Sequence, residues 1–139
     1  MKYKILFICL SFISCKSLSE KTYNRQMKES YLYDFKLVYY KKLLLAGFNN
    51  SSEVKTLVYS DQSGYGEIIL TQEDYKIIDS LVDIDNRMMI EDSIRNIGTV
   101  SEGAQGKRVF NYALMKYNSK WLDKISHQRY MVFFKKNKR

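Results

Sequence analysis

The sequence predicts an all-α protein, a small single-domain bundle of about four to six helices. The chain has 139 residues, which suits one domain, and its 45% hydrophobic fraction is enough for one packed core. It contains no proline and only 6 glycines, whereas average usage would give roughly seven prolines. Apolar residues also recur at spacings of three and four, as one face of a helix requires. These observations favour helices joined by polar turns over a turn-rich β-sandwich.

The first clear helical pattern covers residues 26–46. Gly47 follows at the place where a glycine in the left-handed conformation often ends a helix, and Phe48 can close such a cap. After a polar turn, Ser52 is expected to cap a short helix at 53–60. The apolar positions of the first pattern are Tyr31, Phe35, Val38, Tyr39, Leu43 and Ala46.

A second long helical pattern covers residues 72–97. Thr71, followed three residues later by Asp74, approximates a capping box at its start. Residues 67–70 fit either a brief strand or an extended entry to this helix, and residues 83–86 leave open whether the pattern is one helix or two. Its apolar positions are Ile77, Ile78, Leu81, Val82, Ile84, Met88, Met89, Ile94 and Ile97.

Residues 98–106 are the clearest loop of the chain, because they hold three of its 6 glycines. A helix that ends at Tyr117 follows the loop, and a last helix is predicted over 120–130. The final stretch, 133–139, is aromatic and then basic, which fits either contact with anionic lipid or a helix end beside the core. The apolar positions of these two helices are Val109, Phe110, Ala113, Leu114, Tyr117, Trp121, Leu122 and Ile125.

The beginning of the chain is typical of an export signal. Lys2 and Lys4 precede an apolar run at 5–13 that is interrupted only by Ser11. This run is far shorter than the roughly 20 residues that a membrane-spanning helix needs. After the run comes Ser14 and then Cys15, which resembles a bacterial lipoprotein signal, in which the cysteine is lipidated and becomes the first residue. A secretory signal that is cut nearby is the alternative.

The predicted organisation is therefore a signal at 1–14, a lipidated tether at 15–25, a helical domain at 26–132 and a basic tail at 133–139. Removing the signal discards two lysines and one cysteine, so 21 basic residues then face 15 acidic ones and the charge falls from +8 to +6. We expect the protein in the periplasm, anchored to an envelope membrane by its lipid. Nucleic acid is not expected among its partners, despite the basic composition.

Residues suited to catalysis or metal binding are scarce. His127, the only histidine, lies one turn after Asp123, but nothing specific nominates a nucleophile beside them. Asp79, Asp83 and Asn86 line one helix side, yet the glycine and terminal acid of a calcium loop do not follow, so a solvated acidic face is the better interpretation. The 2 cysteines exclude a disulfide-dense scaffold and a Cys-rich zinc module. The sequence predicts a binding protein with no catalytic residue, no metal and no cofactor.

Residues 106–125 resemble a known family, the type VI secretion amidase immunity proteins. In that family a late helix ends in a Tyr-x-Ser-x-x-Leu-like turn, which here is the stretch from Tyr117 to Leu122. Tyr31–Phe48 and Thr71–Val82 are similar to two further helices of the family.

One feature of the family is missing. Members often carry one cysteine in the first long helix and one in the helix before the turn, and the two form a disulfide. The corresponding regions here show Tyr39-Tyr40 and Tyr112-Ala113. Aromatic packing can replace such a cross-link, so the fold remains compatible with the family.

The resemblance implies a small, all-helical, periplasmic and often dimeric protein that protects a cell from injected peptidoglycan amidases. Such a protein pushes a protruding loop into the Cys-His groove of its cognate amidase. We expect residues 98–106 to be the inserting loop, with 64–67 as the second candidate. The expected effector-binding residues are Gly98, Ser101, Glu102, Gly103, Gln105, Gly106, Lys107 and Arg108.

An envelope lipoprotein with a structural or adaptor role is the alternative interpretation. Such a protein would bind peptidoglycan or an outer-membrane complex and would also need no catalytic residues.

Overall fold

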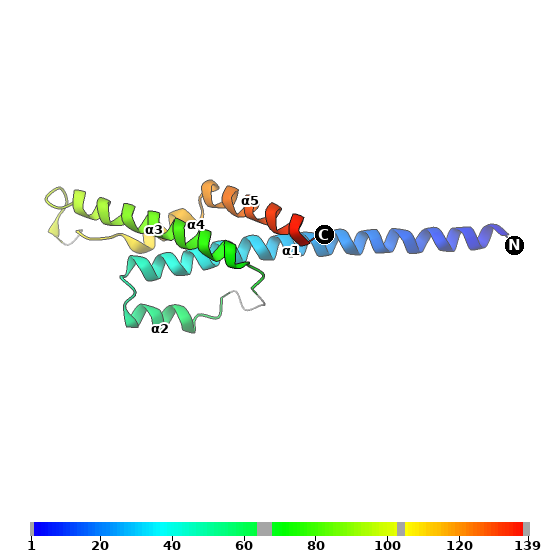
Figure 1. The fold of residues 1–139 in the computed structure, drawn as a ribbon, viewed down its shortest axis with the longest axis horizontal. Coiled ribbons are helices and arrows are strands. Elements are labelled where there is room, and N and C mark those ends of the chain that lie inside the picture. The colour runs from blue at the N-terminus through cyan, green and yellow to red at the C-terminus, as the bar shows by residue number, and fades with distance from the viewer. Residues whose placement is uncertain (1, 64–67, 103–104, 138–139) are drawn as a thin grey trace. The chain divides into compact units, whose positions relative to one another are not determined.

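The structure, a computed structural model, describes residues 2–63, 68–102 and 105–137, with side chains from residue 20 to residue 136. Within these residues it has five helices and no strand, which confirms the predicted all-α class (Figure 1). The described part of the 67–70 stretch is an extended entry to the next helix and not a strand. The helices are α1 (Lys2–Gly47), α2 (Ser52–Ser60), α3 (Gln72–Arg95), α4 (Val109–Tyr117) and α5 (Lys120–Asn137).

The chain divides into two compact units, Met1–Ser30 and Tyr31–Arg139. The described part of the first unit is helical and belongs to α1, which therefore begins well before the 26–46 pattern. Its polar residues include an Arg25–Glu29 pair, with Nε and Oε1 3.8 Å apart, at the i,i+4 spacing that supports a helix. No helix among the described residues is long and apolar enough to cross a membrane. The export signal and the lipidation of Cys15 stay predictions.

The core of the second unit lies between the second half of α1 and helices α3, α4 and α5. Tyr31, Phe35, Tyr39 and Leu43 recur every four residues on α1, and all are fully buried. This stripe confirms the apolar pattern that predicted the first helix. The other helices contribute Ile78, Val82, Met89, Val109, Ala113, Leu122 and Tyr130 to the same core.

Aromatic side chains join the end of α5 to α1. The ring centroid of Tyr31 lies 5.5 Å from that of Tyr130 and 5.1 Å from that of Phe133, and Tyr130 stacks on Phe134 at 5.7 Å. Because of these contacts α5 continues to Asn137, well past the predicted end near residue 130. Within the described residues, the aromatic stretch of the predicted 133–139 tail is thus the end of a helix packed beside the core.

The end of α1 differs from the prediction. Gly47 does not adopt the left-handed conformation, which falls instead on Asn49 and Asn50, with φ of 53° and 57°. The Asn50 amide donates to the Leu45 carbonyl at 2.7 Å, and the Asn49 amide donates to the Ala46 carbonyl at 3.0 Å. This pair of hydrogen bonds is a Schellman cap, in which asparagine takes the place that glycine usually fills.

Gly47 is instead a position of close packing. A Cβ placed on it would lie 2.5 Å from Cγ1 of Val109 and 3.2 Å from its Cγ2. Val109 is buried and begins α4. A side chain at position 47 would therefore push α4 away from α1.

The caps of α2 and α3 fall close to the predicted places. Ser51, and not Ser52, caps α2 by accepting a hydrogen bond from the Val54 amide. Thr71 and Asp74 form the predicted capping box of α3, with each side chain accepting from the other residue's backbone. The 72–97 pattern is a single helix that ends at Arg95.

Several predicted core positions are exposed. On α3 the apolar residues Ile84, Met88 and Ile94 follow two faces of the helix, and only one face meets the core; Ile97 lies in the turn after the helix. On α4 and α5, the side chains of Phe110, Leu114 and Trp121 are likewise exposed. The exposed fractions of these seven side chains run from 41% at Ile84 to 66% at Phe110. The Phe110 ring also contacts that of Phe48, at 5.2 Å between centroids, and the Lys116 ammonium lies 4.7 Å from the centroid of the Trp121 ring.

We predict that Gly47→Ala lowers the free energy of unfolding by about 1 kcal/mol, because overpacking against Val109 outweighs the better helix propensity of alanine. The matched test is the same change in a Val109→Ala background, where the clashing methyl groups are gone. There we expect Gly47→Ala to be neutral or stabilising by up to about 1 kcal/mol in urea denaturation. The same loss in both backgrounds would contradict the packing explanation.

Candidate functional site

The predicted effector-binding residues lie in the loop that joins the end of α3 to the start of α4. Gly98 and Gly106 flank the loop and have φ of +77° and +109°, a region that side chains disfavour. A Cβ at either position would meet nothing within 4 Å, so the backbone conformation, and not crowding, calls for glycine. Gly103 lies outside the described residues, as does the second candidate loop at 64–67.

Three polar side chains of this loop have no partner among the described residues. Ser101, Glu102 and Gln105 are exposed, and within the described residues none of their side chains makes a hydrogen bond or ion pair. The backbone is held locally, since the Gln105 amide donates to the Glu102 carbonyl at 3.2 Å. The loop therefore presents three unengaged polar side chains to solvent.

Lys107 and Arg108 behave differently from each other. The Lys107 ammonium donates to Oδ1 of Asn49 at 2.8 Å and ties the loop to the end of α1. Partial burial lowers the pKa of Lys107 below its usual value. Arg108 precedes α4, is exposed, and has no ion-pair partner among the described residues. Of the two predicted flanking cations, Arg108 is the one available to a partner.

A groove of about 520 Å³ opens beside the loop, between the end of α3 and the start of α4. Arg95, Asn96 and Ser93 line one side of it, and Arg108 and Asn111 line the other. Met115 adds an apolar contact and is 57% exposed. Polar groups around an apolar contact are typical of the rim and centre of a protein interface.

A buried carboxylate fixes the two helices that carry this loop. Asp85 of α3 is 1% exposed and accepts hydrogen bonds from the hydroxyls of Tyr39 on α1 and Tyr112 on α4, the latter at 2.9 Å. The Lys116 ammonium, also on α4, lies 2.6 Å from Oδ1 of Asp85. Burial, together with the hydrogen bond to Asp85, raises the pKa of Tyr39 and Tyr112. We call these four residues the Asp85 cluster.

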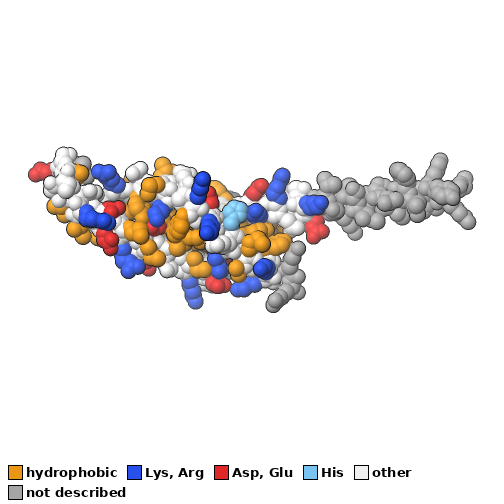
Figure 2. All heavy atoms as spheres, turned by 90° about the horizontal axis from the view of Figure 1, so that it is seen from above, with side chains coloured by type: hydrophobic (Ala, Val, Ile, Leu, Met, Phe, Trp, Pro, Cys, Tyr) orange, Lys and Arg blue, Asp and Glu red, His pale blue; other side chains and the backbone are white. Residues whose placement is uncertain are grey.

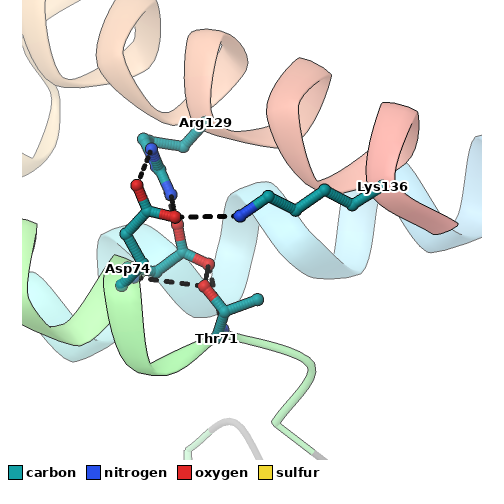
Figure 3. A network of polar contacts seen from close by, with 5 residues as sticks. Thr71, Asp74, Arg129 and Lys136 are labelled. Carbon is teal, nitrogen blue, oxygen red and sulfur yellow. Dashed lines mark hydrogen bonds and ion pairs between the residues drawn. The ribbon is translucent and has the colours of Figure 1, made fainter.

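A second buried carboxylate joins α3 to α5. Asp74 accepts a hydrogen bond from the Arg129 guanidinium at 2.8 Å, and Glu73 beside it pairs with both Arg129 and Lys136 (Figure 3). Burial alone would raise the pKa of Asp74, but the hydrogen bonds from Thr71 and Arg129 hold it below its usual value. The capping box of α3 is thus also an anchor for α5.

The other residues that the sequence singled out are not brought together. His127 is exposed on α5, and Asp123 is engaged elsewhere, accepting from the Lys36 ammonium at 2.6 Å. Asp79 pairs with Lys42, and Asp83 is exposed. Among the described side chains no group of three His, Cys, Asp or Glu residues could hold a metal ion.

Two further grooves flank α2. One, of about 540 Å³, opens toward α3, and the other, of about 480 Å³, is mostly apolar and includes Phe110. The Lys41 ammonium crosses to the end of α2, where it binds the Asp61 carboxylate at 3.0 Å and the Ser63 carbonyl at 3.2 Å. No residue of α2 is buried, so these grooves border a loosely attached helix.

The sequence predicted the capping role of Asp74 but not its burial or its bond to Arg129, and it did not predict the burial of Asp85. Asp74, Ile78, Val82, Asp85 and Met89 lie at spacings of four, four, three and four, and all five are buried. The signal was therefore present: two acidic residues share the helical stripe of the core positions. Asp85 lies on this stripe between Val82 and Met89, whereas Asp79 and Asp83 lie outside it.

No protein-family model matches this chain, and neither a characterised protein nor a solved structure shows significant similarity to it.

We predict that Asp85→Asn lowers the free energy of unfolding by about 3 kcal/mol, because it leaves the half-buried Lys116 ammonium without its counter-charge. The matched control is Asp83→Asn, an exposed position on the same helix, which should change stability by less than about 0.5 kcal/mol. Urea denaturation followed by circular dichroism measures both. Equal losses for the two variants would contradict a structural role for the Asp85 cluster.

The lowered pKa of Asp74 predicts an acid-dependent loss of stability. A carboxylate whose folded pKa lies below its unfolded value, here 3.8, stabilises the fold above that value, and the contribution disappears as pH falls through the folded pKa. The stability difference between the wild type and Asp74→Asn should therefore be constant from neutral pH to about pH 5 and shrink below about pH 4. A difference that stays constant down to pH 2, measured by urea denaturation, would be inconsistent with this account.

Proposed function

We propose that this chain is a non-catalytic immunity protein that inhibits a peptidoglycan amidase by inserting the α3–α4 loop into the amidase's active-site groove. The observation that carries the proposal is the contrast between the loop and its base. Ser101, Glu102 and Gln105 are exposed and unengaged within the described residues, whereas the helices on both sides are fixed through the Asp85 cluster.

A loop with an ordered base suits an inhibitor. Binding orders the loops and side chains at an interface, and each immobilised side chain costs about 0.5–1.5 kcal/mol. The cap at Asn49 and Asn50 and the Lys107–Asn49 hydrogen bond restrict the base of the loop before any partner arrives. The ordering cost then falls mainly on the few side chains that enter the partner.

The surface next to the loop supplies apolar contact area. Leu114 and Met115 on α4 are 55% and 57% exposed, close to the polar groove lined by Arg95 and Arg108. A stable complex usually buries more than about 1,000 Å² in total, which a loop of this length does not provide alone. We propose that the loop enters the amidase while the exposed side of α4 rests on the rim of its groove.

The setting of this activity follows from the sequence. With a lipid on Cys15 the inhibitor would be held at a bacterial envelope membrane, in the periplasm, where an injected amidase meets its substrate. A homodimer is compatible with this arrangement, since the family that the sequence resembles is often dimeric.

The test uses the amidase with a Cys-His active site that we expect to be encoded beside this gene. We predict that the triple variant Ser101→Ala, Glu102→Ala, Gln105→Ala raises the concentration needed for half-inhibition of peptidoglycan hydrolysis by about 100-fold, because a few residues carry most interface energy. The matched control is Ser80→Ala, Glu91→Ala, Gln72→Ala, which removes the same three residue types from exposed positions of α3. The control should inhibit like the wild type.

Two results would overturn the proposal. One is unchanged inhibition by the loop variant. The other is retention of the protein on purified peptidoglycan sacculi with no effect on the amidase, which would identify a structural or adaptor lipoprotein.

A further inference from the structure

The outer face of α5 is basic and partly apolar. Lys120, Lys124, Met131 and Lys135 lie within about 60° of one another around the helix at 100° per residue. All four are exposed, and Trp121 and Val132 lie next to them at the edge of the same face. We call these six residues the α5 outer face. In Figure 2 the histidine of this helix, in pale blue, is surrounded by Lys or Arg and hydrophobic side chains.

The positive charge of this face is not neutralised by any acidic side chain that the structure describes. Within the described residues none of its three lysines makes an ion pair or a side-chain hydrogen bond. The acidic residue of α5, Asp123, binds Lys36 of α1 instead. Two cations of α5 form ion pairs with α3: Arg129 binds Glu73 and Asp74, and Lys136 binds Glu73. Among the described residues, the cations of α5 that face α3 are paired, and Lys120, Lys124 and Lys135 are not.

The exposed apolar side chains decide which anionic partner fits. Met131, Trp121 and Val132 are 53%, 43% and 38% exposed among these lysines. A purely polar polyanion would gain nothing by covering them, whereas a lipid surface takes up apolar side chains below the level of its phosphates. None of the three grooves described above is lined by a residue of α5. The outer side of a single helix is a convex surface, because its side chains radiate from a cylinder. A convex surface suits a flat, fluid partner better than a protruding protein segment.

We propose that the α5 outer face binds the surface of a membrane containing anionic lipid, with the three lysines at the lipid phosphates and with Trp121 and Met131 at the boundary of the acyl chains. This contact is separate from the predicted lipid on Cys15 and from amidase inhibition by the loop. It would add a second attachment, formed by the folded domain itself.

The test measures binding of the full chain to vesicles of phosphatidylcholine and phosphatidylglycerol, and to vesicles of phosphatidylcholine alone. The triple variant Lys120→Gln, Lys124→Gln, Lys135→Gln should bind the anionic vesicles about 100-fold more weakly, since each lysine near such a surface contributes about fivefold. The matched control is Lys55→Gln, Lys76→Gln, Arg87→Gln, which removes three exposed cations without ion pairs from α2 and α3. It should bind within about threefold of the wild type, because charges distant from the membrane are screened by salt.

Fluorescence locates the contact, because Trp121 is the only tryptophan. Its emission should shift to the blue and resist acrylamide quenching on anionic vesicles, and Met131→Ser should weaken binding without changing its salt dependence.

Equal binding by the two triple variants would overturn the proposal, as would unchanged emission of Trp121 in vesicle-bound protein. Binding to soluble polyglutamate that is as strong as binding to anionic vesicles, with the same dependence on the three lysines, would identify an acidic polymer as the partner and overturn it too.

Discussion

The fold of this protein depends on a carboxylate buried at the point where three helices meet. Asp85 is inaccessible to solvent, and its oxygens receive two tyrosine hydroxyls and a lysine ammonium from α1 and α4. A charge in that position costs several kcal/mol if it is unpaired, so the three helices are stable together only in the arrangement that supplies these partners. An apolar residue at position 85 could fill the same space but would not select one orientation of α4.

A second buried carboxylate with an ion-pair partner lies in the first turn of α3. Asp74 completes the cap at the start of its own helix and also accepts a hydrogen bond from Arg129 of α5. One side chain therefore caps α3 and positions α5. The aromatic contacts of Tyr31 with Tyr130 and Phe133 complete this end of the core. The two carboxylates lie on one buried stripe of α3. Through them α3 contacts α1, α4 and α5.

The all-α class and the positions of the helices were predictable because they follow from local spacing and caps. The stripe from Tyr31 to Leu43 and the capping box at Thr71 both require only neighbouring residues, and both are confirmed. The role of Gly47 was not predictable, since its close contact is with Val109, 62 positions later in the numbering. The exposure of Phe110 and Leu114 was not predictable for a similar reason. Periodicity shows that a helix has an apolar face, but not whether another part of the protein covers that face. The loop at 98–106 was located from its glycines, whereas the groove beside it and the different surroundings of Lys107 and Arg108 depend on tertiary packing.

The loose attachment of α2 has a consequence for the way the molecule opens. Since α2 buries no residue and is joined to α1 by the contacts of Lys41, its detachment exposes little apolar surface and leaves both carboxylate clusters intact. Segments of this kind open with a much smaller free energy than the core. The amide hydrogens of α2 should therefore exchange with solvent on a separate and faster timescale than those of α3. The chain can then accommodate sequence change around α2 while the helices that present the loop keep their geometry.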